Sequence, residues 1–345
     1  MIIDANVNIK MLGFGTALPD GPPVSNVDLL SHDPGFKEKD LSFLGGMSAR
    51  IEAKFGVCER YLTRKPWEPE RAGEDTSEEL AFRALRDAWA GRKEPSPALF
   101  IHGTTTTSRY TGSQAASILG RLGIVAPAYE IKAGCSTSLA SLHMAVSFLL
   151  AGYPNVAVAC AETLSKVMHP EIRETWFGLA DGGAALWFER NDATPDFRIL
   201  KSYYSTDGKH ADLFTTPGLL PPSAADLERR NYCLQGDKDV LSRVSREHYS
   251  MMLDRLFSDN CPLSGIHCLI PHQVNLDLIR DVLKSRMAAA RLVWNAREFG
   301  NLGGASILFS LAECLRKGIF SKNERILLIS VGGGLSFAAQ IWEKL

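Results

Sequence analysis

Apolar residues recur along the chain in two patterns: short runs of strand length, and longer stretches with the spacing of an amphipathic helix. This alternation predicts an α/β protein in which helices cover layered sheets. In the first half, strands are predicted over 8–15, 98–103, 128–132, 155–161 and 183–189, and helices over 76–90, 113–122 and 136–151. In the second half, strands are predicted over 197–208, 266–271, 325–331 and 335–342, and helices over 240–257, 275–287 and 305–317.

The two halves of the chain resemble each other. Each half opens with a strand followed by a polar loop, and each closes with an apolar strand after a glycine-rich turn, Asp181-Gly-Gly and Gly332-Gly-Gly. This predicts a duplicated α/β unit, divided as 1–190 and 191–345. Because no linker rich in Pro and Ser separates the halves, we expect them to pack as one body. The polar segment 36–59 is predicted to leave the core as a helical excursion.

The overall composition is that of an ordinary globular chain. Of its 345 residues, 45% are hydrophobic and 22% are charged, and the net charge is −1. This balance does not indicate a nucleic-acid partner or an anionic membrane. No apolar run approaches the roughly 20 residues of a membrane span, and the N-terminus lacks the pattern of a secretion signal. We therefore expect a cytoplasmic protein.

The seven cysteines and eight histidines do not have the spacing of a disulfide framework or a metal site. The cysteine count is odd, and neither a CxxC nor an HExxH pattern occurs. Three cysteines lie in apolar stretches and are expected in the core: Cys160, Cys268 and Cys314. We expect no metal and no cofactor.

Cys135 is the most informative residue. It lies where an apolar, strand-like stretch ends and a helix of small residues begins. A thiol at a helix N-terminus faces unpaired backbone N–H groups and the positive end of the helix dipole, which favour the nucleophilic thiolate. Taken alone, a buried structural cysteine is the commoner outcome.

Two further segments favour a catalytic role. His272 follows a short apolar strand in Pro271-His-Gln, and Asn301 lies in the glycine-rich segment Gly300-Asn-Leu-Gly-Gly. One Cys, one His and one Asn at such junctions are typical of an assembled thiol active site. A papain-like hydrolase uses the same three residue types, but its Cys-Gly-x-Cys-Trp context is absent here.

Six motifs carry a resemblance that extends over nearly the whole chain. They are Gly56-Val-Cys-Glu-Arg-Tyr, Ala133-Gly-Cys-Ser-Thr-Ser-Leu, Ala180-Asp-Gly-Gly-Ala-Ala, Pro271-His-Gln-Val-Asn-Leu, Gly300-Asn-Leu-Gly-Gly-Ala-Ser and Gly332-Gly-Gly-Leu-Ser-Phe-Ala-Ala. In this order and spacing, they resemble the β-ketoacyl-ACP synthase III family of the thiolase superfamily, where ACP is acyl carrier protein.

The resemblance implies a five-layered αβαβα thiolase fold built from two duplicated halves, and a homodimer. It implies a Cys135-His272-Asn301 triad that loads an acyl group from a thioester primer and condenses it with malonyl-ACP after loss of CO₂. Backbone N–H groups of Cys135 and Gly333 are the candidates for an oxyanion hole. Asn275 is expected to order the loop around His272. The partners implied are the acyl carrier protein and an acyl thioester, either acyl-CoA or acyl-ACP.

Several positions depart from the family pattern. Gly134 before the nucleophile and Ser-Thr after it differ from the usual Ala and Gly neighbours of the family. Arg50 and Lys54 occupy the places where CoA-using relatives often carry Trp and Arg, which leaves open whether the donor is CoA or ACP. Asp277 occupies the place of an Arg that contacts the carrier protein in relatives.

Other residues on the surface and around the pocket are expected to take part in binding. Arg280 and Lys284 share a helix face and are candidates to replace the missing Arg contact. Tyr110 matches a position that reaches across the family's dimer into the neighbouring primer pocket. With Leu302 and Leu335, it is expected to line the substrate pocket.

Three functions remain open at this point. The leading one is a decarboxylating condensing enzyme. The second is a Cys-dependent acyltransferase of the same fold, which moves an acyl group to a hydroxyl or an amine. The third is a non-catalytic partner subunit, although an intact Cys-His-Asn set argues against it.

Overall fold

Ten strands of the computed structural model hydrogen-bond edge to edge in the order β12-β11-β13-β14-β8-β1-β7-β6-β4-β5. The structure describes residues 2–68, 74–90, 96–257 and 262–345. The first half supplies β1 Ile2–Ala17, β4 Phe100–Gly103, β5 Ala128–Ile131, β6 Asn155–Thr163 and β7 Asp181–Arg190. The second half supplies β8 Phe197–Thr206, β11 Cys268–Pro271, β12 Arg291–Leu292, β13 Arg325–Gly332 and β14 Ser336–Lys344.

The two halves repeat one strand pattern. In the first, β4 runs parallel to β5 and β6, and β7 runs antiparallel to β6 and β1. In the second, β11 runs parallel to β12 and β13, and β14 runs antiparallel to β13 and β8. The antiparallel pair of β1 and β8 joins the halves. The duplicated α/β architecture is thus confirmed, whereas the exact boundary between 190 and 191 stays a prediction.

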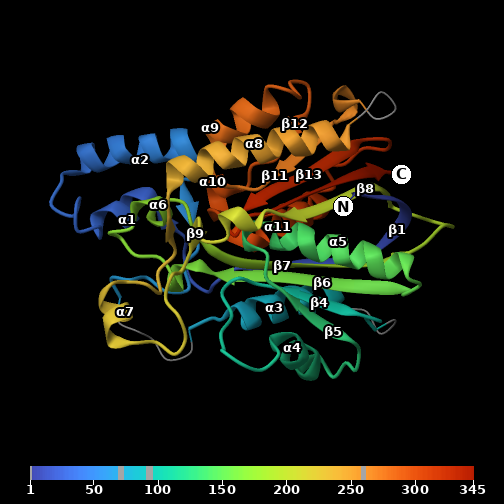
Figure 1. Cartoon of the computed structure of the whole chain (residues 1–345), viewed down its shortest axis with the longest axis horizontal. Coiled ribbons are helices and arrows are strands. Elements are labelled where there is room, and N and C mark those ends of the chain that lie inside the picture. The colour runs from blue at the N-terminus through green and yellow to red at the C-terminus, as the bar shows by residue number, and fades with distance from the viewer. Residues whose placement is uncertain (1, 69–73, 91–95, 258–261) are drawn as a thin grey trace.

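Helices form three layers that alternate with the strands (Figure 1). α3 Ser77–Trp89 and α4 Gln114–Leu122 cover one outer face, and α8 Lys238–Leu256 and α9 Leu276–Ile279 cover the other. α5 Thr137–Leu150 and α11 Ser306–Arg316 form the middle layer. Three separate apolar cores lie between these layers, so the five-layered αβαβα fold is confirmed.

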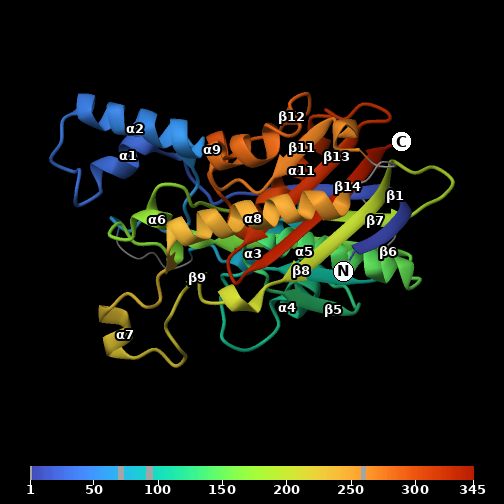
Figure 2. The same cartoon turned by 45° about the horizontal axis from the view of Figure 1, so that its top comes forward.

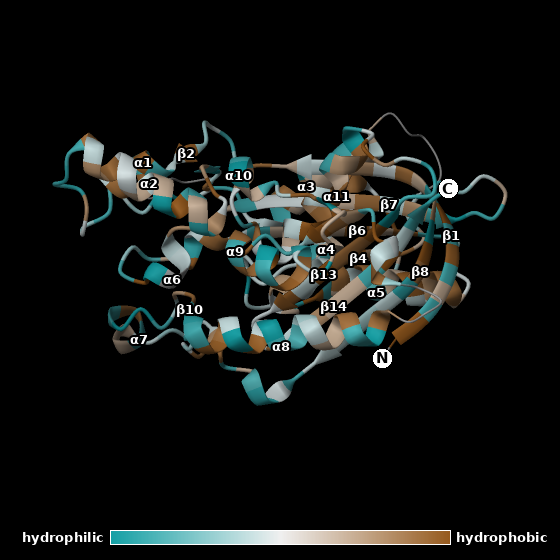
Figure 3. Ribbon diagram, turned by 90° about the horizontal axis from the view of Figure 1, so that it is seen from above, coloured by the Kyte–Doolittle hydropathy of each residue, from teal (hydrophilic) through white to brown (hydrophobic). Residues whose placement is uncertain are grey.

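Local sequence explains the difference between middle and outer helices. α5 is apolar on nearly all sides, and its side chains pack into the core shared with α11. α8 buries only one face, and Figure 3 shows its hydrophilic and hydrophobic residues alternating along the helix. At the start of α3, the Thr76 side chain accepts a hydrogen bond from the Glu79 N–H and caps the helix.

Two elements differ from the sequence prediction. β1 begins at Ile2 and extends well before residue 8, because its first part pairs with β8 and its second part pairs with β7. The helix predicted over 275–287 is a short α9 followed by a π-helix, η5 Arg280–Lys284. The predicted excursion over 36–59 contains α2 Leu41–Phe55, which projects with α1 Asn26–Ser31 from one end of the molecule (Figure 2).

The remaining described elements are short. They are β2 Val24–Ser25, β3 Glu59–Arg60, β9 Phe214–Thr215, β10 Gln235–Gly236, α6 Arg173–Trp176, α7 Ala224–Glu228, α10 Ala296–Phe299, and the turns η1 Gly134–Ser136, η2 Leu164–Lys166, η3 Gly208–His210, η4 Leu263–Gly265 and η6 Gly303–Ala305. Across the described ranges, no helix is both long and apolar enough to cross a bilayer. Within the same residues, no group of three potential metal ligands gathers. The six described cysteines are free, with Cys160, Cys268 and Cys314 buried as expected, and Cys261 lies outside the described residues.

Candidate active site

Cys135 lies in η1, the single turn that connects β5 to α5. Its carbonyl accepts a hydrogen bond from the Ser330 hydroxyl at 3.0 Å, and the Ser136 hydroxyl donates to the Ser336 carbonyl at 2.9 Å. The Thr137 hydroxyl accepts from the Ala133 N–H at 3.0 Å. The Ser-Thr pair that follows the cysteine therefore fastens its turn, in part to β13 and β14 of the second half.

Gly134, the other departure beside the nucleophile, is explained by backbone geometry. Its φ is +54°, a conformation that L side chains rarely adopt, and a Cβ placed there would lie 2.3 Å from the Gly333 carbonyl oxygen. Glycine at this position lets the two loops approach each other closely.

His272 lies directly after β11 and is almost fully buried. Its backbone N–H donates to the Ile329 carbonyl of β13 at 2.9 Å. Both ring nitrogens are buried, and neither has a hydrogen-bond partner among the described residues. Burial lowers the pKa of the imidazole to about 3, so the ring is neutral at physiological pH.

Gln273 fixes the loop that carries His272, and the sequence analysis missed it. Its amide nitrogen donates to the carbonyls of Pro271 and Val293, and its oxygen accepts from the N–H groups of Asn295 and Ala296. The only signal in the sequence was its place beside the histidine.

Asn301 has a fixed side-chain orientation. Its Oδ1 accepts from the Gly303 N–H at 2.9 Å and from the Ser306 hydroxyl at 3.1 Å. Since these contacts occupy the oxygen, the Nδ2 hydrogens are left to donate to a ligand. Its backbone pairs with Gly178 and Ala180, which anchors the segment between α10 and η6.

Backbone contacts bring the three segments together at the end of β13. A Cβ on Gly332 would lie 2.5 Å from the Cys135 nitrogen, and His272 is bonded to Ile329 three residues earlier on the same strand. A Cβ on Gly304, in η6 just after Asn301, would lie 2.9 Å from the Gly134 carbonyl oxygen. A thiol, a neutral imidazole and a donating amide therefore belong to segments packed against one another.

The resting state of Cys135 differs from the sequence expectation. Burial, and to a smaller extent the negative charge of Glu162, raises the pKa of the thiol to about 12, although the Gly333 N–H lowers it somewhat. The prediction that the helix terminus favours a resting thiolate is thus wrong, because desolvation of the charged form outweighs the backbone donors. The residue keeps some surface open to solvent, as a group that must meet a substrate requires.

Glu162 is a second residue that the sequence analysis missed. Its carboxylate is fully buried at the end of β6 and accepts hydrogen bonds from the backbone and hydroxyl groups of Thr105 and Thr106. Burial nevertheless raises its pKa to about 7. The polar run of threonines after β4 thus encloses a carboxylate next to η6. In the sequence, the feature that could have drawn attention to Glu162 is a single acidic residue at the end of an apolar strand.

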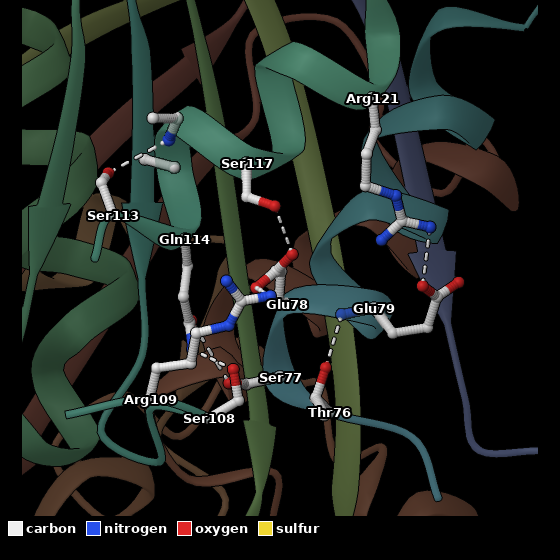
Figure 4. A network of polar contacts seen from close by, with 12 residues as sticks. Thr76, Ser77, Glu78, Glu79, Ser108, Arg109, Ser113, Gln114, Ser117 and Arg121 are labelled. Carbon is white, nitrogen blue, oxygen red and sulfur yellow. Dashed lines mark hydrogen bonds and ion pairs between the residues drawn. The ribbon is translucent and has the colours of Figure 1, made fainter. Parts of the chain in front are cut away.

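Tyr110 lies on the surface, 74% exposed, and does not line its own chain's thiol. Figure 4 shows how the neighbouring loop is held: Gln114 donates to the Ser108 hydroxyl at 2.8 Å, and Arg109 lies 3.9 Å from the Glu78 carboxylate. The anchored loop presents Tyr110 to the outside.

The two leucines expected in the pocket lie in different cores. Leu302 is buried between the sheets, against the space left by Gly182. Leu335 is buried in the core beneath α8, directly after the Gly332–Gly334 turn.

The four basic residues that are candidates for binding the acyl donor or the carrier protein fall into two groups: three lie on or beside α2, and the fourth bonds to backbone carbonyls. Arg50 and Lys54 lie on α2, and Arg280 lines a surface cavity of about 430 Å³ together with the C-terminal part of α2 and Trp294. Lys284 has a different role: its amine donates to the carbonyls of Met287, Ala288 and Ala290 and ends the helix. Because these carbonyls occupy its amine, Lys284 is the least available of the four basic candidates for contact with a carrier protein.

Asn275 begins the helix next to His272. Its Oδ1 accepts from the Leu278 N–H at 3.1 Å, which makes it the N-cap of α9. The residue thus orders the segment that follows the histidine.

A fold of two repeated α/β units, in which the segments that carry a thiol, an imidazole and an amide pack against one another, is that of thiolase-like condensing enzymes. The family described as 3-oxoacyl-[acyl-carrier-protein] synthase III matches residues 129–208, and its C-terminal counterpart matches 256–344. Cys135 falls within the first match, and His272 and Asn301 fall within the second.

Relatives of known sequence and structure agree with this match. The β-ketoacyl-[acyl-carrier-protein] synthase III of Caldanaerobacter subterraneus is 30% identical over 305 residues, which cover 85% of this chain and 89% of that protein. The crystal structure of 3-oxoacyl-(acyl carrier protein) synthase III from Pseudomonas aeruginosa PAO1 matches with a TM-score of 0.80 at 25% identity, over 98% of both chains. A priming β-ketosynthase of the R1128 polyketide pathway has the same fold, with a TM-score of 0.79 at 21% identity over 99% and 98% of the two chains. The chain belongs to the 3-oxoacyl-[acyl-carrier-protein] synthase III family, and it is an acyl-transferring condensing enzyme.

Proposed function

We propose that Cys135, His272 and Asn301 perform a two-step condensation in which an acyl thioester loads the cysteine and malonyl-ACP then extends it. The observation that carries this proposal is the packing of their three segments at one end of β13, with a neutral imidazole and a free amide donor. Neutral donors stabilise a developing oxyanion without acting as strong bases.

In the first step, the Cys135 sulfur attacks the carbonyl of the incoming thioester. The thiol proton passes to the neutral imidazole of His272, which has both nitrogens unpartnered among the described residues. The N–H groups of Cys135 and Gly333 receive the oxyanion. The donor's C–S bond then breaks, and its thiolate takes the proton from the imidazolium.

In the second step, malonyl-ACP enters and loses CO₂. The electron pair of the broken C–C bond passes to the thioester, whose oxygen accepts hydrogen bonds from His272 and the Asn301 amide. The resulting carbon nucleophile attacks the acyl-Cys135 carbonyl and forms the new C–C bond. The cysteine leaves as a thiolate and takes up a proton from solvent, and the product is a β-ketoacyl-ACP.

The substrates and partners follow from this reaction. The primer is an acyl-CoA or acyl-ACP, the acyl carrier protein is the partner, and no metal or cofactor takes part. Arg280, exposed beside α2, supports a docking role for this surface. We further propose a cytoplasmic homodimer in which the exposed Tyr110 reaches the neighbouring primer pocket.

Intact-protein mass spectrometry tests the proposal with a panel of acyl-CoAs and acyl-ACPs. Wild type is compared with Cys135→Ala and with Cys233→Ala, which removes another partly accessible thiol. We expect an acyl adduct on wild type and on Cys233→Ala, and none on Cys135→Ala. An adduct that persists in Cys135→Ala would contradict the nucleophile, and an adduct discharged only by hydroxyl or amine acceptors would favour the acyltransferase alternative.

A further inference from the structure

The nucleophile turn is held by two serines of the second half, Ser330 in β13 and Ser336 in β14. The Ser330 hydroxyl donates to the Cys135 carbonyl at 3.0 Å, and the Ser336 hydroxyl donates to the Ala133 carbonyl. Both serines are buried, at 0% and 4% exposed. The carbonyls on either side of Gly134 are therefore each fixed to the opposite half of the molecule by one hydroxyl.

Ser136, which follows the nucleophile, connects the two strand serines. Its hydroxyl donates to the Ser336 carbonyl at 2.9 Å and lies 3.2 Å from the Ser330 hydroxyl oxygen. Ser136 is also fully buried. A buried hydroxyl is unfavourable unless it is hydrogen-bonded, and all three hydroxyls of this serine cluster have partners. The cluster gives a physical reason for the departure of Ser136 from the family's usual Ala and Gly neighbours.

The two strand serines flank the turn that carries the candidate oxyanion donor. Ser330 precedes the glycine turn Gly332–Gly334, and Ser336 follows it and pairs with Gly332 across β13 and β14. The same turn packs directly on the nucleophile, since a Cβ on Gly332 would lie 2.5 Å from the Cys135 nitrogen. The serine cluster therefore fixes the nucleophile turn against the glycine turn from both flanking strands.

The relative position of the two turns governs the reaction with a thioester. The Cys135 sulfur must reach the carbonyl carbon while the N–H groups of Cys135 and Gly333 point at the oxygen that becomes negative. A misplacement of about 1 Å can lower such a rate on the order of 100-fold. Alkylation of the same sulfur by iodoacetamide needs no oxyanion donor. A comparison of the two reactions therefore separates the alignment of the sulfur from its reactivity.

We propose that Ser330 and Ser336 are positioning residues of the condensation, which set the place of the Cys135 sulfur relative to the Gly333 N–H. This inference rests on the proposed function. Neither hydroxyl contacts the substrate or exchanges a proton during the reaction. Each acts through a carbonyl of the nucleophile turn, so the loss of either hydroxyl lets that turn shift relative to Gly333 while the thiol itself stays intact.

Ser202 of β8 provides a matched control. It is fully buried, and its hydroxyl lies 2.8 Å from the His143 Nδ1 and accepts from the Gln340 amide at 2.8 Å. Ser202→Ala thus removes a buried, hydrogen-bonded hydroxyl from the same sheet. Neither of its partners belongs to the nucleophile turn or the glycine turn. The control therefore reports the loss of stability that a missing hydroxyl causes without a loss of alignment.

The test compares wild type with Ser330→Ala, Ser336→Ala and Ser202→Ala, using the acyl-CoA or acyl-ACP that loads wild type fastest. It measures the maximal rate of acyl loading, the donor concentration at half-maximal rate, alkylation of Cys135 by iodoacetamide at one fixed pH, and the melting temperature. For Ser330→Ala and Ser336→Ala we expect the maximal loading rate to fall about 10- to 100-fold. The half-maximal donor concentration and the alkylation rate should stay within about threefold of wild type. For Ser202→Ala we expect wild-type loading and alkylation and a lowered melting temperature.

The inference is overturned if Ser330→Ala or Ser336→Ala loads within about twofold of an active wild type, or if only the half-maximal donor concentration changes. It is also overturned if alkylation falls as much as loading, because access to the thiol would then be lost rather than its alignment. An equal loss of loading in Ser202→Ala would contradict it too, since reduced stability alone would explain the effect. A wild type that takes up no acyl group contradicts the proposed function itself, which is distinct from an active wild type with equally active variants.

Discussion

Replacing Gly134 with alanine tests whether the close approach of the nucleophile turn and the glycine-rich turn is needed. The added methyl would lie 2.3 Å from the Gly333 carbonyl oxygen, whereas ordinary contacts begin at 3.4 Å, so one loop must move by roughly 1 Å. A φ of +54° adds strain of about 1–2 kcal/mol for any L side chain. Overpacking typically adds about 1–3 kcal/mol, so the total destabilisation is roughly 2–5 kcal/mol.

The variant Gly123→Ala separates the effect of backbone strain at positive φ from the effect of a steric clash. Gly123 ends α4 with a φ of 68°, and nothing lies within 4 Å of a Cβ built there. Gly123→Ala should therefore lower the free energy of unfolding only through backbone strain, by about 1–2 kcal/mol. Urea unfolding of both variants measures the difference in stability. Acyl loading measures the chemical consequence, because a displaced Gly333 N–H no longer faces the sulfur.

We expect Gly134→Ala to lose more stability than Gly123→Ala and to load acyl groups at least about tenfold more slowly than wild type. The reasoning is refuted if Gly134→Ala is as stable as Gly123→Ala and loads at the wild-type rate. The turn would then tolerate a side chain at this position, and the close approach would have no role.

Four further outcomes follow from the site. Since the pKa of the Cys135 thiol is raised to about 12, iodoacetamide labelling should rise about tenfold per pH unit from pH 7 to beyond 10; a plateau near pH 7 would contradict the buried, protonated thiol. Asn301→Ala removes one oxyanion donor and should lower CO₂ release on the order of 100-fold while loading changes little, as parallel loading and CO₂ assays would measure. Arg280→Glu should weaken carrier-protein binding several-fold in titration calorimetry. Lys284→Met instead exposes three carbonyls and should lower the melting temperature without changing that affinity.

The sequence could propose Cys135, His272 and Asn301 as site residues because each lies in a short motif, after β5, β11 and α10 respectively. The order of strands and helices was also accessible, since apolar spacing reports which faces are buried. The π-helix after α9 was not accessible, because apolar spacing predicts a helix without distinguishing an α-helical turn from the wider π-helical turn of Arg280–Lys284.

Two properties of the site depend on tertiary structure alone. The thiolate preference expected of Cys135 from its place at a helix start is reversed by burial, which only the folded surroundings determine. The charge state of His272 likewise depends on burial, which lowers the pKa of its imidazole to about 3. Local sequence thus identifies which groups are present, and packing sets their charge state and which of them remain unpaired.

The most direct test of the central claim is a malonyl-ACP chase of isolated acyl-enzyme. Wild type is first loaded on Cys135 and freed of donor, then mixed with malonyl-ACP while the adduct mass and the released CO₂ are followed together. The proposed condensation predicts that one CO₂ appears for each adduct discharged and that β-ketoacyl-ACP accumulates. Adduct that remains on Cys135 while no CO₂ appears, or CO₂ release that Cys135→Ala retains without forming a β-ketoacyl product, would contradict it.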